Sequence, residues 1–412
     1  MFLKRLHKKR KVVKTRRKNS ENFEEVHYSS SSENSCTDGD AETPIQIKDA
    51  VELKQLPLTE KESRLISSVE DLSIHPSPIT CAVVVGDGDS DEMVIWFGDK
   101  LGYVYNSKVG SGVQRMDEKH AKCVGAMCYS SNLKRVITGG NDGNVFQWDA
   151  SERKHFHSFE RAHRSAITGL STSARSTLLF AVSTDKKITV WSLQEQILMH
   201  SFYGPLSSIY GVSANHQECC VVVGADNIPR YYKVSQGKHN AYDPASTYIE
   251  CVCFLSDNIF VCGTAQGELV VYDINKSKPM QTHNLSHSFG FVGDGAGFEQ
   301  VSSRSVIDVP NAWNGNPIWS ICSFSISSSD ENLMFATGSC DGFIRIWRVL
   351  DGEIVQVGHA PIEGIVTSLS FSPSLKMLVG SVAKEPRNGR WNTWTTTSNR
   401  IVLLHMSSYF AP

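Results

Sequence analysis

Long hydrophobic runs are absent from this chain of 412 residues. No apolar stretch reaches the roughly 18 residues that a membrane-spanning helix needs, and the first residues are too basic for a secretory signal peptide. The chain has 11 cysteines, but no CxxC pair and no Cys/His cluster at zinc-ligand spacing. These absences predict a soluble intracellular protein with no membrane insertion, no metal site and cysteines that serve as small, reduced, buried residues.

Catalytic signatures are also missing. The sequence has no nucleophile elbow and no oxyanion motif. Three glycines of the segment FGFVGDGAGF, Gly293, Gly295 and Gly297, resemble a nucleotide loop only superficially. No strand, helix and downstream acid surround them, and the Walker lysine is absent. The sequence therefore predicts no enzyme activity, no cofactor and no small-molecule substrate.

The chain does contain a repeat. Six segments each have a turn with Gly, Asp or Asn, then a short apolar strand, then an aromatic residue. The aromatic positions are 43, 43, 41, 40 and 75 residues apart, and they are Tyr105, Trp148, Trp191, Tyr232, Tyr272 and Trp347. The last interval is one period plus an insertion, Asn284 to Pro317, which we interpret as a flexible surface loop that binds a partner. A degenerate seventh repeat surrounds His405, and a period near 40 residues is typical of one propeller blade.

Seven repeats predict an all-β fold, a single seven-bladed WD40-type β-propeller over residues 65–412. Four short antiparallel strands cannot bury both faces of their sheet, so blades stack around an axis until the ring closes. In such rings the outermost strand of the last blade usually comes from the N-terminal side of the first repeat. Residues Val69 to Ile74 alternate apolar and polar side chains, and we expect them to supply that strand.

The repeats resemble WD-repeat proteins, whose blades share a hydrogen-bonded set of His, Ser, Asp and Trp. In the best repeat this set is His163, Ser183, Asp185 and Trp191. Two further pairs at the same offset are Asp142 with Trp148 and Asp341 with Trp347. A hydrolase triad would also use Ser, His and Asp, but a structural role in tying strands to turns is favoured. Repeats four and five depart from the pattern, with Gln266 standing where Asp is usual in the fifth.

Charge is concentrated at the N-terminus. Residues 1–18 carry ten Lys or Arg and no acid, residues 19–50 carry eight acids and one Lys, and the rest has a net charge of −5. The acidic, Ser-rich stretch has few apolar residues to bury, so residues 1–62 are predicted to be a disordered tail. A short helix is possible near residues 59–68, because Thr59 and Glu62 have capping-box spacing.

The basic part of the tail suits a nuclear import signal, and the same cations would attract a phosphate backbone. A solvated tail with neither role is the alternative. The cations concerned are Lys8, Lys9, Arg10, Lys11, Lys14, Arg16, Arg17 and Lys18.

A long connection near the C-terminus is the most specific candidate site. The segment AKEPRNGRWNTWTTTS far exceeds the two to five residues of a hairpin turn. Cations beside flat aromatics suit RNA, in which phosphates meet guanidinium groups and unpaired bases stack on indoles. A structural role, with the tryptophans covering the end of the sheet, is compatible with this. The candidates are Lys384, Arg387, Arg390, Trp391 and Trp394.

The sequence resembles one WD-repeat family in particular, the U3 small nucleolar RNA-associated propeller proteins of the small-subunit processome. The likeness is most distinctive over Ile362 to Trp394, where the motif GRW falls in an equivalent long loop. NPIWSI around Trp319 and RAHRSAITGLS in the third repeat add to it.

The resemblance implies a non-enzymatic component of the U3 ribonucleoprotein that acts in precursor ribosomal RNA processing in the nucleus and nucleolus. Implied partners are U3 small nucleolar RNA, through its B/C motif, the kink-turn-binding protein and other box C/D core proteins, and processome proteins. Arg390 and Trp391 are the implied contact residues. A generic scaffold, such as a ubiquitin-ligase substrate adaptor or a chromatin-associated protein, is the alternative, because fold does not select function. The acidity of the propeller allows RNA binding only if basic groups cluster on one rim.

Overall fold

The computed structural model describes most of the chain from residue 66 onward. The described residues are 66–86, 93–108, 112–173, 176–287, 315–324, 333–350, 352–372, 376–387, 389, 393–394 and 397–406. The predicted tail, Arg390 and Trp391 lie outside them. Residues 66–68, the end of the possible short helix, belong instead to a strand, because they pair with the C-terminal strand of the chain.

Seven four-stranded antiparallel sheets make up the described part, which confirms the predicted seven-bladed propeller. The innermost strands are β2 (Ile79–Val85), β6 (Val124–Ser130), β10 (Ile167–Thr172), β14 (Ile209–Ala214), β18 (Ile249–Phe254), β22 (Ser320–Ser323) and β26 (Ile365–Ser372). The second strands are β3 (Val94–Asp99), β7 (Arg135–Gly140), β11 (Leu178–Ser183), β15 (Cys219–Gly224), β19 (Ile259–Thr264), β23 (Leu333–Gly338) and β27 (Met377–Ala383). The third strands are β4 (Tyr103–Lys108), β8 (Val145–Asp149), β12 (Ile188–Ser192), β16 (Arg230–Lys233), β20 (Leu269–Asp273), β24 (Phe343–Leu350) and β28 (Asn399–Met406). The outermost strands are β5 (Val113–Lys119), β9 (Lys154–Phe159), β13 (Ile197–Phe202), β17 (Lys238–Ala241), β21 (Gln281–His283), β25 (Glu353–Pro361) and β1 (Ile66–His75).

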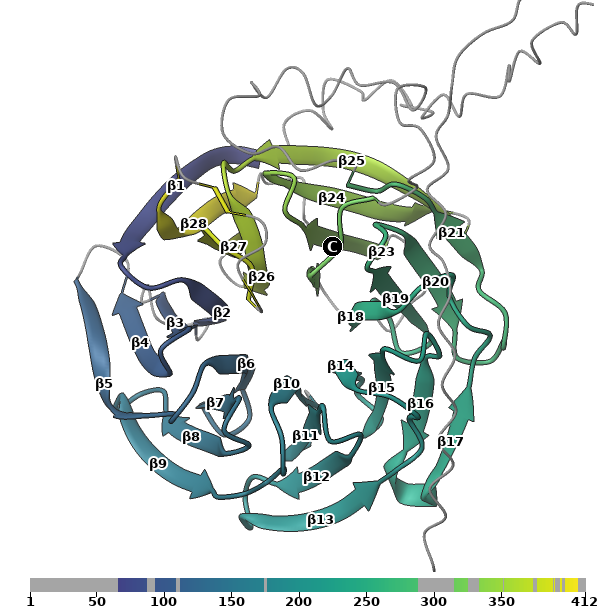
Figure 1. The fold of residues 1–412 in the computed structure, drawn as a ribbon, viewed down its shortest axis with the longest axis horizontal. Coiled ribbons are helices and arrows are strands. Elements are labelled where there is room, and N and C mark those ends of the chain that lie inside the picture. Colours follow the sequence, from purple (N-terminus) through teal and green to yellow (C-terminus); the bar gives the residue numbers. More distant parts are fainter. Residues whose placement is uncertain are drawn as a thin grey trace, which may run out of the picture. The chain divides into compact units, whose positions relative to one another are not determined.

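The blades surround a central axis, with the innermost strands facing it (Figure 1). The strands alternate in direction, so every connection from a second to a third strand lies at the end of the ring where the innermost strands begin. The connections from one blade to the next lie at that same end, which we call the entry face. The segment predicted as the candidate site connects β27 to β28 through residues 384–398, so the connection begins and ends on the entry face.

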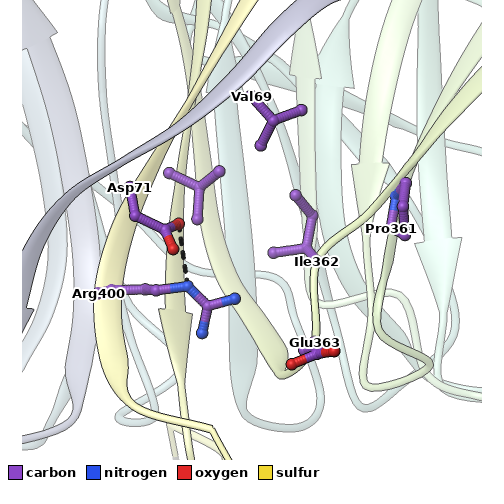
Figure 2. A pocket seen from close by; sticks show the side chains of 7 residues that line it. Val69, Asp71, Pro361, Ile362, Glu363 and Arg400 are labelled. Atoms are coloured by element: carbon purple, nitrogen blue, oxygen red, sulfur yellow. Dashed lines mark hydrogen bonds and ion pairs between the residues drawn. The ribbon is translucent and has the colours of Figure 1, made fainter.

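Strand β1 closes the ring, as the sequence predicted. It pairs antiparallel with β28, with Val69 opposite Leu404 and Asp71 opposite Val402. Arg400 of β28 adds an ion pair to Asp71, its Nε lying 3.1 Å from Oδ1. Figure 2 shows this pair at the edge of a hollow of about 500 Å³ that is walled by β1, β28 and the end of β25. The last blade is therefore built from both ends of the propeller.

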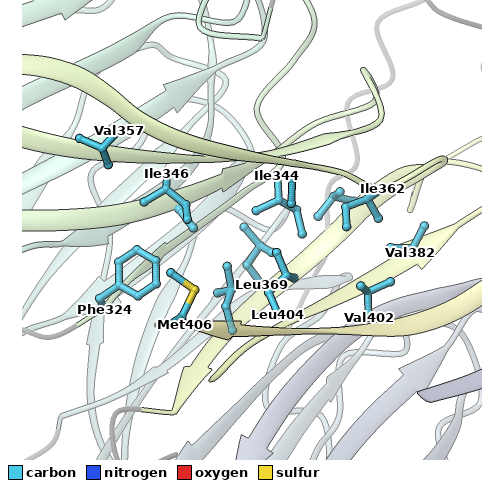
Figure 3. Close-up of a cluster of buried hydrophobic side chains, with 14 residues drawn as sticks. Phe324, Ile344, Ile346, Val357, Ile362, Leu369, Val382, Val402, Leu404 and Met406 are labelled. Carbon is cyan, nitrogen blue, oxygen red and sulfur yellow. The ribbon is translucent and has the colours of Figure 1, made fainter. Parts of the chain in front are cut away.

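Apolar side chains hold neighbouring blades together. In the described residues seven large clusters of buried side chains each join one blade to the next. The cluster between the sixth and seventh blades packs Ile344 and Ile346 of β24 against Leu369 of β26 and Leu404 of β28 (Figure 3). Second strands such as β15 are buried along their whole length, whereas β5 buries only Met116. The core is thus a ring of interfaces, as the period-two pattern of short strands requires.

Candidate nucleic-acid interface

The connection between β27 and β28 is closed at its base. The backbone N–H of Trp394 donates to the carbonyl of Lys384 at 2.8 Å. The N–H of Lys384 donates to Oδ1 of Asn399, the first residue of β28, at 3.0 Å. The Lys384 side chain is exposed on the entry face. These bonds fix the base of the loop to the start of β28.

Lys100, in the β3–β4 turn of the first blade, anchors this loop. Its Nζ lies 2.9 Å from Oε1 of Glu385, and it donates to the carbonyls of Gly389 at 3.0 Å and Pro386 at 3.4 Å. Glu385 is the loop's acid, so this ion pair neutralises the charge that would repel a phosphate. The contact with Lys100 was not predicted from the sequence, because 285 residues separate the two partners.

Arg387 points toward the central axis. One guanidinium nitrogen donates to the backbone carbonyl of Thr367 in β26 at 2.7 Å. The side chain is half-buried and lines a cavity of about 430 Å³ on the entry face. Arg387 therefore lies at the centre of the entry face with part of its donor capacity used by the protein.

Trp394 takes the structural role that the sequence left open. Its side chain is only 6% exposed, and it packs with Cys340 and Ile365, against which Trp319 also lies. A base cannot stack on an indole that is already covered. Of the five predicted contact residues, the structure thus leaves Lys384 and Arg387 accessible and buries Trp394.

The blade sets are present in three blades. In the sixth blade, the indole N–H of Trp347 donates to Oγ1 of Thr337 at 2.7 Å. The same Oγ1 lies 2.7 Å from Nε2 of His287, whose Nδ1 lies 3.0 Å from Asp341. A neutral His287 with its proton on Nδ1 satisfies every one of these contacts. The second blade repeats the arrangement with the residues His120, Thr138, Asp142 and Trp148.

The third blade uses a different hydroxyl from the one predicted. His163 and Asp185 are 3.1 Å apart as expected, but the hydroxyl between His163 and Trp191 belongs to Thr189, at 2.9 Å from each. Ser183 instead accepts a hydrogen bond from the N–H of Asp185 at 3.2 Å. Thr189 lies on β12, opposite Ala181 of β11, whereas Thr138 and Thr337 lie on the second strand. In the third blade the third strand carries this hydroxyl, whereas in the other two blades the second strand does. Sequence position alone therefore identified the wrong residue, Ser183.

Burial and hydrogen bonding set the ionisation of these groups. Burial lowers the pKa of His163 and of His287, and it outweighs the nearby carboxylates. Burial opposes ionisation of Asp341, but His287 and Arg345 outweigh it and hold the pKa of Asp341 below its usual value. In the sixth blade the Thr337 hydroxyl and His287 are fully buried, and the same hydroxyl accepts the indole N–H of Trp347, so the set ties strands together.

Besides the three threonines, the histidines of two blade sets were not predicted from the sequence. His120 lies 22 residues before Asp142, the same spacing as His163 to Asp185, so the spacing could have revealed it. His287 lies 54 residues before Asp341, inside the segment interpreted as a flexible loop. His287 and Asn316, near the two ends of that segment, are buried and bonded to each other, with the Asn316 amide donating to the His287 carbonyl at 3.0 Å. The insertion is therefore anchored at both ends, and residues 288–314 lie outside the described part.

Other features of the described residues are structural. The ten cysteines among them are free thiols, and burial raises the pKa of Cys81 to about 12. None of the helices in these residues has the length and apolar character to cross a membrane. No group of three His, Cys, Asp or Glu side chains within the described ranges could hold a metal ion.

Residues 113–149, 153–192 and 309–348 match the WD domain, G-beta repeat family. Together with the seven sheets, this match shows a seven-bladed β-propeller that contains WD repeats.

Several sequence relatives have names that refer to the U3 particle or to ribosomal RNA processing. They confirm the resemblance to U3-associated propeller proteins. The chain is 26% identical over 287 residues to the U3 snoRNP-associated protein-like EMB2271 of Arabidopsis thaliana, covering 69% of this chain and 56% of that protein. It is 23% identical over 327 residues to Ribosomal RNA-processing protein 9 of Saccharomyces cerevisiae, covering 66% of this chain and 56% of that one. The chain thus spans little more than half the length of these relatives. The solved structure of U3-55K has the same fold, with a TM-score of 0.71, 23% identity and coverage of 82% of this chain and 98% of that one.

Proposed function

We propose that this protein is a non-catalytic binding component of the U3 small nucleolar ribonucleoprotein and acts in precursor ribosomal RNA processing during small-subunit biogenesis. The observation that carries the proposal is the set of relatives named for the U3 particle and for ribosomal RNA processing, which match along the propeller. The long entry-face loop with its neutralised acid supports it. The protein's place would be the nucleus and nucleolus.

The finer part of the proposal concerns the contact. We assign the loop Lys384 to Trp394 to a surface that recognises the B/C motif of U3 RNA together with its kink-turn-binding protein, beside other box C/D core and processome proteins. Arg387 supports this assignment, because it reaches the centre of the entry face. Lys384 adds an exposed cation at the loop's base. Arg390 and Trp391 belong to the same loop and are included on the basis of the resemblance.

The test is a paired substitution, Arg387→Ala with Arg390→Ala, in the full chain. Loss of charged hydrogen bonds should weaken assembly with U3-type RNA carrying its kink-turn-binding protein by about 1–3 kcal/mol. The matched control is Lys238→Ala with Lys278→Ala, two exposed cations at the opposite end of the ring. Because Arg387 also bonds to Thr367, the comparison uses protein whose melting temperature is unchanged. Assembly equal to wild type by a folded double variant would move the contact away from this loop.

A further inference from the structure

At the mouth of the central channel, the residue near the start of the innermost strand differs from blade to blade. Six of the seven innermost strands carry a bulge after their first or second residue, which redirects one side chain at the entry face. The bulged residue is Thr80 in the first blade, Thr168 in the third and Thr367 in the seventh. Each threonine hydroxyl donates to the backbone carbonyl of the first residue of the next innermost strand at 2.6–2.8 Å. These threonines fasten one blade to the next.

The fourth and fifth blades place larger groups at the same bulge. They carry Tyr210 and Glu250 there, and both side chains line the cavity of about 430 Å³. Tyr248, 45% exposed, lies edge-on to Tyr210 with 6.2 Å between ring centroids. Trp319 forms another part of the wall. A position used elsewhere for fastening blades here supplies aromatic surface and a carboxylate to an open cavity.

The polar groups of the cavity balance one another in charge. It holds one carboxylate, Glu250, one guanidinium, Arg387, and the amide of Asn141. Burial raises the pKa of Glu250, although Arg387 counteracts part of that rise. Within the described residues, the side chains of Glu250 and Asn141 make no hydrogen bond. The cavity therefore presents unused hydrogen-bonding groups without a large net charge.

Exposed cations flank this cavity. Lys122, Arg164 and Lys186 each lie within three residues of a lining residue, and all three are exposed. Asp142 and Asp185, in the β7–β8 and β11–β12 turns, accept hydrogen bonds from backbone N–H groups and from histidines of the blade sets. Two exposed acids, Glu118 and Glu160, lie four residues before Lys122 and Arg164. Three exposed cations thus lie close in the chain to residues that line the cavity, although the propeller as a whole is acidic. Cations gathered beside one opening can hold the phosphates of an RNA backbone.

These features select among ligands. Arg387 would repel a cationic side chain in the cavity, and Glu250 would repel a phosphate. A flat, neutral group with its own hydrogen-bond donors and acceptors is repelled by neither residue, and it gains aromatic contact with Tyr210 and Tyr248. We propose that the channel mouth receives one unpaired nucleobase of an RNA, with Lys122, Arg164 and Lys186 holding the adjoining phosphates. The proposal rests on the proposed function in binding RNA, and it names a contact separate from the β27–β28 loop tip.

A binding assay tests this with probes that separate base from backbone. Fluorescent single-stranded oligouridine and an abasic ribose-phosphate chain of the same length are titrated against the full chain. Wild type should bind oligouridine at least about five-fold more tightly, since one base stack is worth that factor or more. The variant Tyr210→Thr with Glu250→Thr, which copies the other blades, should lose this preference and still bind the backbone. Phe156→Thr with Glu353→Thr, on outer strands, is the matched control.

The outcomes are distinct. Equal binding of both probes by wild type, or a preference unchanged in the Tyr210→Thr, Glu250→Thr variant, would overturn the proposal. Competition by polyglutamate as effective as by oligouridine would also overturn it, because it would show a simple anion-binding surface.

Ultraviolet crosslinking of the protein with U3-type RNA, followed by mass spectrometry, locates the contact. Adducts on Tyr210, Tyr248 or Trp319 are expected. Adducts elsewhere alone would contradict the base site and leave the proposed function standing, whereas absence of any bound RNA would contradict both.

Discussion

Thr337 shows how much one buried hydroxyl can do at the residue scale. It accepts the indole N–H of Trp347 and contacts Nε2 of His287, and through His287 it is linked to Asp341. All four side chains are almost fully buried. In the sixth blade the set therefore ties a second strand, a third strand and an entry-face turn together at one point, in a region from which water is excluded.

Thr337→Val keeps the side-chain shape and removes the hydroxyl. It leaves the N–H of Trp347 and one nitrogen of His287 without a partner, so we expect a loss of about 1–3 kcal/mol in the free energy of unfolding. Urea denaturation measures it. Thr282→Val, on the exposed face of β21, is the control and should change stability by less than about 0.5 kcal/mol. Equal stability of the two variants would show that the set contributes little.

The buried histidines predict a pH dependence. The folded state lowers the pKa of His163 and His287 below the ordinary value of 6.5, so it binds fewer protons than the unfolded chain. The stabilisation is complete above the unfolded pKa and is lost as pH falls below it, toward the lower folded value. Urea denaturation should therefore give a smaller free energy of unfolding at about pH 5.5 than at about pH 7.5.

His163→Gln should reduce this dependence, because glutamine does not titrate. The measurement compares the slope of stability against pH for the variant and for wild type. An identical slope, or a wild-type stability that is constant across this range, would contradict the assignment of a neutral His163.

At the scale of the element, the sequence pattern predicted strands better than contacts. The closing strand was identifiable because residues Val69 to Ile74 alternate, and β1 does pair with β28. The burial of Trp394 and the Lys100 anchor were not identifiable, because both depend on residues from other blades. The position of His287 was hidden by the length of the insertion. Local periodicity thus specifies an element, whereas the closing of the ring decides which side chains remain accessible.

Removing β1 should open the ring. A chain that begins after residue 75 leaves the edge of β28 unpaired and exposes part of the interface with the first blade. We expect a lower melting temperature and association into larger species, measured by calorimetry and size-exclusion chromatography. A chain that begins at residue 63 is the control and should melt like the full protein, as predicted if residues 1–62 are a disordered tail. A stable, monomeric chain without β1 would contradict the closure.

On the scale of the whole molecule, charge is divided between segments. Residues 1–18 hold ten Lys or Arg and no acid, whereas the chain as a whole has a formal net charge of −2. The blades add cations locally, at the channel mouth and on the β27–β28 loop. We therefore expect the tail to supply import and non-specific attraction, and the entry face to supply recognition.

Fusing residues 1–18 to a cytosolic reporter tests the first part. The basic cluster should move the reporter into the nucleus, as fluorescence microscopy would show. Replacing Lys8, Lys9, Arg10 and Lys11 by Ala should abolish that movement, and an unchanged cytosolic distribution of the original fusion would remove the import role.

The central claim is that this propeller works on U3-type RNA as part of a ribonucleoprotein. Crosslinking the protein in cells, recovering its RNA and sequencing it tests this claim most directly. The account predicts enrichment of U3 small nucleolar RNA, with crosslinks near its B/C motif, and precursor ribosomal RNA beside it. Recovery of no specific RNA, together with protein partners typical of a ubiquitin-ligase adaptor or a chromatin scaffold, would contradict it.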